Sequence, residues 1–544
     1  MKISYAYLTL FGALVLASAC NQQKAGPTVS GDDIKSNLAV LANDSMMGRK
    51  PFTEGETKTI KYLSDQFKKY GLEPGNNGSY FQEVPMVEIT STPSAMQISG
   101  KTKATFNSST DFVALTRREV DTVSLKNSPL VFVGYGVVAP EFKWNDYAGL
   151  DVKGKTVVVL VNDPGFKSGE KIFHGDTMTY YGRWTYKYEE AARQGAAGVL
   201  IVHQTEPASY PWQVVNTSNT GAKLELTQAD KHMNRCKVEG WITEDAAKKL
   251  FEPAGITGDF RALARKQGFK AIPLNSNISL SLQNKLKYSK SNNVIAMLKG
   301  SATPDEYVIY SAHWDHLGIG KPDAKGDSIY NGAIDNGTGS AALLAIAKTF
   351  ANSGEKPKRS IVFLAVTAEE QGLLGSEYYA THPIFPVNKT VANLNMDALA
   401  ANGETKDISV TGKGQNDLED ELATLTNPAG LTLVGDDLPG AGHYYRSDHF
   451  NFAKVGVPAL DIHTGIDSKL HGPEWGKAKN KEYTALHYHQ PSDNYSPDMD
   501  MSGMVQTADI LYRLGLKLAD ETTWPGWKAG SEFKAVREKS MGAK

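Results

Sequence analysis

Almost entirely apolar segments alternate with amphipathic ones after residue 292. Five of the apolar segments have the length of a β-strand: NVIAMLKG, EYVIYSAH, SIVFLAVT, VANLNMD and VPALDIH. Helical segments such as residues 339–350 lie between them. Strands that are apolar on both faces are typical of parallel sheets covered by helices. The pattern therefore predicts an α/β fold with a mostly parallel central sheet flanked by helices.

Two further regions precede this alternation. Residues 32–41 and 54–70 place apolar side chains at helical spacing and predict two amphipathic helices. Between residues 126 and 280, the segments PLVFVGYGVV, KTVVVLVND and AAGVLIVH predict buried strands, and residues 186–194 predict a helix. Glycine-containing turns separate these elements. This region is expected to be a small mixed α/β unit inserted into a larger domain.

The first twenty residues differ from the rest of the chain. Residues 5–19 are mostly apolar or small and too short for a stable bilayer span, which predicts a signal peptide. Cys20 follows small residues, as in a bacterial lipobox, where the cysteine becomes lipidated. We therefore expect export and a lipid anchor at Cys20 that faces the periplasm or the cell exterior, with residues 20–29 as a tether. The alternative is plain secretion after cleavage near Ala19.

Length and composition limit the remaining choices. A chain of 544 residues is too long for one ordinary core. The predicted division is a signal peptide (1–19), a tether (20–29), the two parts of the main domain (30–125 and 286–525), the insert (126–285) and a C-terminal surface tail (526–544). The net charge of -2 and the scattered charges argue against a nucleic-acid partner. With only two cysteines, a thiolate-rich metal site is excluded.

Side chains able to perform chemistry follow the predicted strands. His313 ends one strand, Glu369 and Glu370 follow another, and Asp397 follows a third. Asp335 lies in a glycine-rich turn before a helix, and His489 lies in a late loop. In open α/β sheets, sites form where strands end at their carboxyl side. Adjacent carboxylates after a buried strand are costly unless a cation neutralises them.

The types of these side chains indicate which metal would bind. Imidazoles and carboxylates without thiolates suit zinc, with manganese or cobalt as substitutes. Three carboxylates and two imidazoles are enough for two ions that share one carboxylate. The sequence therefore predicts a metal centre at one edge of the sheet.

Six motifs occur in the order found in one known family. They are HWDHLG, NGAIDNGTGSAALL, AVTAEEQGLLGS, NLNMDAL, RSDHF and YHQPSDNY. The set resembles the co-catalytic zinc aminopeptidases, a family that includes secreted bacterial leucyl aminopeptidases and glutamate carboxypeptidase II. The insert resembles a protease-associated (PA) domain, and LANDSMMGR and YFQEVP look like the start of such enzymes. The resemblance implies a zinc exopeptidase fold, two zinc ions and peptide substrates.

The resemblance also implies roles for individual residues. One zinc would be bound by His313 and Asp397, the other by Glu370 and His489, and Asp335 would bridge them, with a cis peptide bond following Asp335. Three more residues would have catalytic roles: Glu369 as general base, Asp315 as hydrogen-bond partner of the His313 ring, and Tyr488 as donor to the developing oxyanion.

Several residues near the predicted ligands could have either a functional or a structural role. Arg446, Asp448 and His449 in the RSDHF motif are expected to line or brace the substrate pocket. Tyr181 and Arg183 in the insert either reach over the cleft or simply pack within the insert. His316 is expected to support the ligands rather than to bind metal. The remaining histidines without motif support are expected to be structural or exposed: His443, His463, His471 and His487.

The most consistent function is an aminopeptidase. A carboxypeptidase or dipeptidase would use the same metal site, and the sequence leaves this choice open. A metal-free receptor is disfavoured because all five ligands and Glu369 are present, and the full ligand set also argues against a one-zinc glutaminyl cyclase. A serine mechanism lacks the G-x-S-x-G elbow with a partner histidine.

Overall fold

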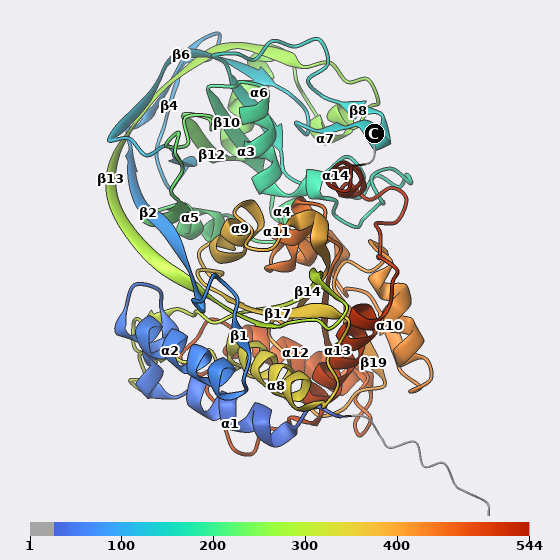
Figure 1. Cartoon of the computed structure of the whole chain (residues 1–544). Coiled ribbons are helices and arrows are strands. Elements are labelled where there is room, and N and C mark those ends of the chain that lie inside the picture. The colour runs from blue at the N-terminus through green and yellow to red at the C-terminus, as the bar shows by residue number, and fades with distance from the viewer. Residues whose placement is uncertain (1–26, 543–544) are drawn as a thin grey trace, which may run out of the picture.

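The computed structural model describes residues 27–542 and consists of two lobes joined by long strands (Figure 1). The predicted signal peptide and the lipidation site Cys20 lie outside the described residues. Within residues 27–542, no helix is both long and apolar enough to cross a membrane. The larger lobe contains the N-terminal helices and the C-terminal half of the chain, and the smaller lobe contains the predicted insert.

The central sheet of the larger lobe contains the five predicted apolar strands. Its strands lie in the order β13 (Ile272–Leu298), β17 (Arg359–Val366), β14 (Thr303–His313), β18 (Thr390–Asn395), β21 (Ala459–Thr464), β19 (Asp407–Val410) and β20 (Thr432–Val434). The four strands β17, β14, β18 and β21 are parallel. Strand β13 pairs antiparallel with β17, and β19 pairs antiparallel with β21. The α/β fold with a central sheet is confirmed, and the whole sheet is mixed.

Helices cover both faces of this sheet. On one face lie α1 (Gly31–Leu41), α2 (Glu54–Lys69), α8 (Gly339–Asn352) and α13 (Ser502–Asp520), which form the main core. On the other face lie α9 (Leu374–Thr381) and α11 (His449–Lys454), between the sheet and the insert (Figure 1). Two further helices border the larger lobe: α10 (Leu418–Thr426) and α12 (Pro473–Leu486).

The smaller lobe has its own core, built around a parallel part of the same continuous sheet. Its parallel strands are β6 (Thr122–Phe132), β9 (Thr156–Leu160), β10 (Gly198–His203) and β12 (Val238–Thr243), with β5 (Phe112–Leu115) antiparallel to β12. Helices α3 (Trp184–Arg193) and α6 (Glu244–Phe251) pack against them. Shorter elements complete the fold: β1 (Glu73–Pro74), β3 (Met96–Gly100), β4 (Ala104–Phe106), β7 (Val138–Ala139), β8 (Trp144–Asn145), α4 (Thr205–Ala208), α5 (Trp212–Ser218), β11 (Ala222–Leu226), α7 (Phe260–Ala264), β15 (Gly318–Ile319), β16 (Ile329–Tyr330) and α14 (Lys534–Ser540).

Two long strands join the lobes. Strand β2 (Phe81–Pro93) pairs with residues 282–294 of β13 along its whole length. The 27-residue strand β13 also pairs with β6 in the small lobe and with β17 in the large one. The predicted boundary between residues 285 and 286 therefore falls inside a continuous strand. The division of the chain into domains stays a prediction.

The C-terminal segment differs from the predicted surface tail. Phe533 and Arg537 are buried, and Arg537 donates hydrogen bonds to the carbonyl oxygens of Val387 and Thr390 at 3.1 and 2.9 Å. Glu532 accepts a hydrogen bond of 2.9 Å from the backbone N–H of Tyr180 in the insert. The segment therefore packs across both lobes, because its few apolar and hydrogen-bonding side chains find partners there.

Candidate metal centre and active site

Parallel strand ends bring three of the predicted ligands together. His313 is the last residue of β14 and lies opposite Val366, the last residue of β17. Glu370 comes four residues after Val366 in the chain. Strand β18, on the other side of β14, ends two residues before Asp397. These three side chains therefore meet at one edge of the sheet, as expected from the carboxyl ends of adjacent parallel strands.

Two loops bring the remaining predicted ligands. Asp335 lies in the turn before α8, and the peptide bond between Asp335 and Asn336 is cis, as the family resemblance implied. His489 lies in the loop after α12 with a positive φ of 57°. The buried turn and the more exposed loop enclose the edge of the sheet from opposite sides.

Each of two imidazole nitrogens faces two carboxylates. His313 Nε2 lies 3.3 Å from Asp335 Oδ1 and 3.2 Å from Asp397 Oδ1. His489 Nε2 lies 3.1 Å from Asp335 Oδ2 and 3.0 Å from Glu370 Oε2. The two oxygens of Asp335 therefore serve different imidazoles, so this carboxylate stands between two half-sites.

These distances fit a shared cation in each half-site. Ligand atoms about 2.0–2.1 Å from a tetrahedral zinc ion lie about 3.3 Å from one another. The observed separations of 3.0–3.3 Å are close to that value. A single N–H group shared between two carboxylates bonds each of them with poor geometry, whereas a metal ion can bind all of them. The donor set therefore fits two metal ions.

The electrostatics of the cluster favour a cation. Burial lowers the pKa of His489, but hydrogen bonds to Asp335 and Glu370 outweigh burial and raise that pKa to about 10. Burial alone would raise the pKa of Asp335, but His313 and His489 lower it well below its usual range. Burial, together with Asp397 and Glu370, raises the pKa of Glu369 well above its usual range. A cation beside these carboxylates would favour the charged form of Glu369.

Asp315 occupies a position different from the expected one. His313 Nδ1 lies 3.1 Å from the backbone carbonyl of Asp315, whereas the nearest carboxylate oxygen is 3.9 Å away. The Asp315 carboxylate instead accepts the backbone N–H of Glu369 at 3.0 Å. The backbone of Asp315 therefore orients the His313 ring, and its side chain fixes the segment that carries Glu369.

Further side chains hold the carboxylate ligands. His316 Nδ1 lies 2.5 Å from Glu370 Oε1, which leaves Glu370 Oε2 to face His489. The hydroxyl of Ser447 donates to Asp397 Oδ2 at 2.6 Å. Both contacts fix a carboxylate so that one oxygen points into the centre, as hydrogen-bond partners of metal ligands do.

The predicted pocket residues separate into two groups. Asp448 accepts a hydrogen bond from Ser376 at 2.6 Å, and His449 is fully buried against Tyr444, so both support the pocket wall from behind. Tyr181 packs inside the insert, where its hydroxyl donates to Glu141 at 2.5 Å. These three side chains do not line the cavity described below.

The other predicted residues lie closer to the centre. The ring of Tyr488 stacks on His489 with 3.9 Å between centroids, and the side chain remains exposed. Arg446 precedes Ser447, and its Nη2 donates to Ala441 and Ser209 at 2.7 and 3.2 Å. Arg183 extends from the insert near Arg446, and burial together with Arg446 lowers the pKa of Arg183 to about 10.

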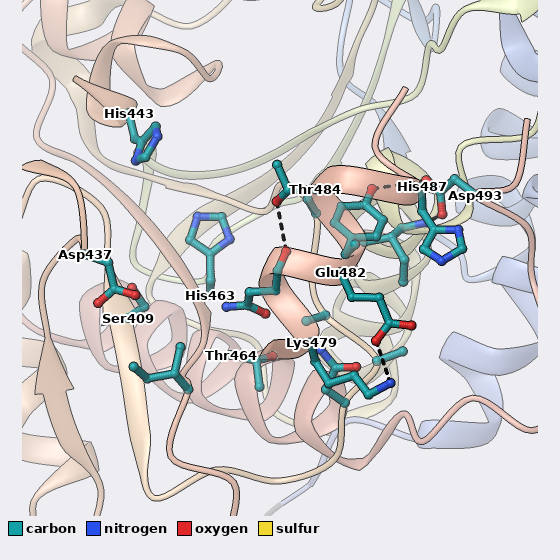
Figure 2. A pocket seen from close by; sticks show the side chains of 18 of the residues that line it. Ser409, Asp437, His443, His463, Thr464, Lys479, Glu482, Thr484, His487 and Asp493 are labelled. Carbon is teal, nitrogen blue, oxygen red and sulfur yellow. Dashed lines mark hydrogen bonds and ion pairs between the residues drawn. The ribbon is translucent and has the colours of Figure 1, made fainter. Parts of the chain in front are cut away.

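A cavity of about 560 Å³ opens beside the centre (Figure 2). It begins at Ile334 and Ala398, the sequence neighbours of two ligands, and His443 and His463 line its far side. Its opposite wall is helix α12, including Lys479, Glu482 and Thr484 (Figure 2). The sequence pattern gave no sign of this cavity, because its walls come from segments far apart in the chain.

The described fold therefore carries a cluster of imidazoles and carboxylates at one edge of a mixed α/β sheet. Residues 293–514 match the sequence model of peptidase family M28. This segment of the chain is similar to metallopeptidases of that family.

Individual proteins are similar to parts of this chain. An aminopeptidase of Mus musculus (NAALADL1) is 29% identical over 218 residues, 35% of this chain and 27% of the relative. A probable glutamate carboxypeptidase of Arabidopsis thaliana (AMP1) is 27% identical over 281 residues, 46% of this chain and 33% of the relative. The chain thus spans about a third or less of the length of these two relatives. The aminopeptidase structure from Aneurinibacillus sp. strain AM-1 is 18% identical, with a TM-score of 0.47 and coverage of 91% of this chain and 95% of that one.

Proposed function

We propose that the chain is a zinc-dependent exopeptidase that removes N-terminal residues from peptides at a site with two zinc ions. The observation that carries this proposal is the placement of Asp335, whose two oxygens face the imidazoles of His313 and His489. It supports one ion held with His313 and Asp397 and another held with Glu370 and His489, with Asp335 shared. Manganese or cobalt would suit the same donors.

The residues around the centre supply the proton transfers. Bound zinc would lower the pKa of water and polarise a carbonyl group. Glu369 accepts a proton from the attacking water and donates it to the leaving amine, a role that its place 3.9 Å from His313 Nε2 supports. The hydroxyl of Tyr488, whose ring stacks on His489, donates to the developing oxyanion.

The surroundings of the centre favour a free amino group. Glu369 and Asp397 keep 12% and 16% of their side chains exposed, so a substrate ammonium can reach their charges. The cavity beside Ala398 supports binding of the terminal side chain, because Ile334, Ala398, Ala400 and Ala401 are among the residues that line it. A carboxylate-rich site next to a partly apolar cavity is suited to an N-terminal residue.

A second candidate is recognition of the free carboxyl end, as in a carboxypeptidase or dipeptidase. Within residues 27–542, neither Arg183 nor Arg446 has a carboxylate within ion-pair distance, and the Nε of each is buried without a partner. Unpaired guanidinium groups bind carboxylates with two parallel hydrogen bonds. These two arginines lie where the insert meets the metal centre.

A panel of blocked dipeptides tests the two candidates. We expect N-acetylation to abolish hydrolysis and C-amidation to change kcat/KM by less than threefold. If C-amidation instead raised KM more than tenfold in the wild type but not in Arg446→Gln, the second candidate would replace the first. The exposed Arg513→Gln variant is the control for loss of a guanidinium.

We also propose that the chain is exported and anchored through a lipid at Cys20, and that residues 126–285 act as a PA-like insert. Both proposals rest on the sequence patterns described above. Labelling with a radioactive fatty acid tests the anchor. A labelled wild type with an unlabelled Cys20→Ala variant is expected, and an unlabelled wild type would leave only secretion.

A further inference from the structure

Arg49 is a buried arginine that contacts only backbone carbonyl groups. It is 1% exposed, and its guanidinium donates to Trp314 O at 2.9 Å, Gly332 O at 2.8 Å, Asn331 O at 2.6 Å and Leu41 O at 2.7 Å. Among the described residues, no carboxylate lies within ion-pair distance of it. A buried charge is costly unless it is compensated, so this placement needs a reason.

Three of the four carbonyl groups that Arg49 contacts, those of Trp314, Asn331 and Gly332, belong to the segments that carry two ligands. Trp314 directly follows His313, and Gly332 lies three residues before Asp335. The planar guanidinium, with five donors in a fixed arrangement, can hold both segments at a set separation. Arg49 therefore fixes the spacing between His313 and Asp335, which together form one half-site.

The turn before Asp335 is also held from the other side. Asp493 accepts the backbone N–H groups of Ile334 and Asp335 at 3.0 and 3.1 Å. Arg49 thus contacts the carbonyl groups of this turn, and Asp493 contacts its N–H groups. Burial lowers the pKa of Arg49 to about 10, while Asp493 and three carboxylates of the centre favour its charged form.

The segment around Arg49 also approaches the centre closely. Gly48 has a φ of 64°, and a Cβ there would lie 2.6 Å from the carbonyl oxygens of Gly318 and Tyr330. The chain is therefore locked against the loops beside His316. The motif LANDSMMGR, which the catalytic mechanism does not use, is the segment that makes this contact.

We propose that Arg49 is a positioning residue of the metal centre, which sets the distance between the loops of His313 and Asp335 and thereby the affinity for zinc. This inference rests on the proposed zinc site. Its effect is on the ligands, because Arg49 touches neither substrate nor the reacting atoms. Loss of such supporting contacts typically weakens metal binding roughly 10–100-fold.

Arg359 provides a matched control for this inference. It is also 1% exposed and donates to the carbonyl groups of Leu518, Thr522 and Thr523 at 2.7–3.2 Å and to Glu306. It lies at the start of β17, the end of that strand away from the metal ligands. Loss of Arg359 therefore removes similar contacts without touching the centre.

The zinc dissociation constant, measured by competition with a chromogenic chelator below the unfolding temperature of each variant, tests the inference. We expect Arg49→Gln to raise it at least tenfold and Arg359→Gln to change it less than twofold. An unchanged constant in Arg49→Gln, or an equal rise in Arg359→Gln, would overturn the inference. If Arg49→Gln does not fold, Arg49→Lys gives the same test, because it keeps the charge but loses the planar set of donors. A wild type that binds no zinc would overturn the proposed function as well.

Discussion

Replacing Glu369 by glutamine removes the proposed general base and keeps the shape of its side chain. The carboxylate lies 3.9 Å from His313 Nε2, beyond hydrogen-bond distance, and the backbone N–H donates to Asp315 at 3.0 Å. The substitution therefore keeps the backbone contact that positions residue 369. It removes only the capacity to accept a proton.

The size of the effect follows from this role. General acid–base catalysis contributes roughly 10²–10⁴-fold, which corresponds to about 2.7–5.4 kcal/mol in the activation free energy. Since Asp335 and the other proposed ligands are untouched, zinc content should stay at the wild-type level. The loss should appear in kcat, because the substrate cavity is also unchanged.

Steady-state hydrolysis of a free-amine dipeptide, together with zinc content of the purified protein, measures both expectations. Glu377→Gln is the control, because Glu377 is partly buried in α9 and its pKa responds to burial and Lys454 rather than to groups of the centre. A Glu369→Gln variant with kcat within threefold of the wild type and normal zinc would refute the assignment of the base.

Three further substitutions test the fold around the site. Glu189→Gln should lower the free energy of unfolding at pH 7 by about 1–3 kcal/mol, because it removes the 2.9 Å ion pair between the insert and Lys454. Burial raises the pKa of Glu189, but Lys454, the Tyr180 hydroxyl and Arg235 together outweigh burial and lower the pKa to about 2. This stabilisation is therefore present above the ordinary pKa of 4.5 and lost as the pH falls from 4.5 towards 2. Equal losses in urea unfolding at pH 7 and pH 2.5 would contradict this. Gly48→Ala should lower the melting temperature more than Gly71→Ala. Both glycines have positive φ, but only at residue 48 would the added Cβ meet backbone atoms. Equal shifts of the melting temperature in calorimetry would disprove the close approach. Leu344→Ala, in the core of α8, should cost about 2–5 kcal/mol in denaturant unfolding, and a loss below 1 kcal/mol would contradict tight packing there.

Part of the candidate site could be predicted from local sequence alone. His313, Glu370 and Asp397 each follow an apolar strand, and parallel strands end at the same edge of a sheet. Asp335 was marked by its glycine-rich turn. These signals are local, so one sequence was enough to reveal them.

Other parts depend on contacts between distant residues. Arg49 contacts carbonyl groups 8 to 283 residues away, and a carbonyl group carries no mark in the sequence. The hydrogen bond between the Asp315 carboxylate and the backbone N–H of Glu369 could not be predicted from the sequence for the same reason. The apolar segment before Lys299 was expected in a parallel strand, but it ends the long strand β13, which arrives from the other lobe and so runs antiparallel to β17.

Zinc binding by the metal-stripped chain tests the central claim most directly. Exhaustive chelation should abolish dipeptide hydrolysis, and titration with zinc should restore it as two ions bind per chain. Activity that survives complete removal of metal, or full recovery with one bound ion, would contradict a centre in which Asp335 is shared by two zinc ions.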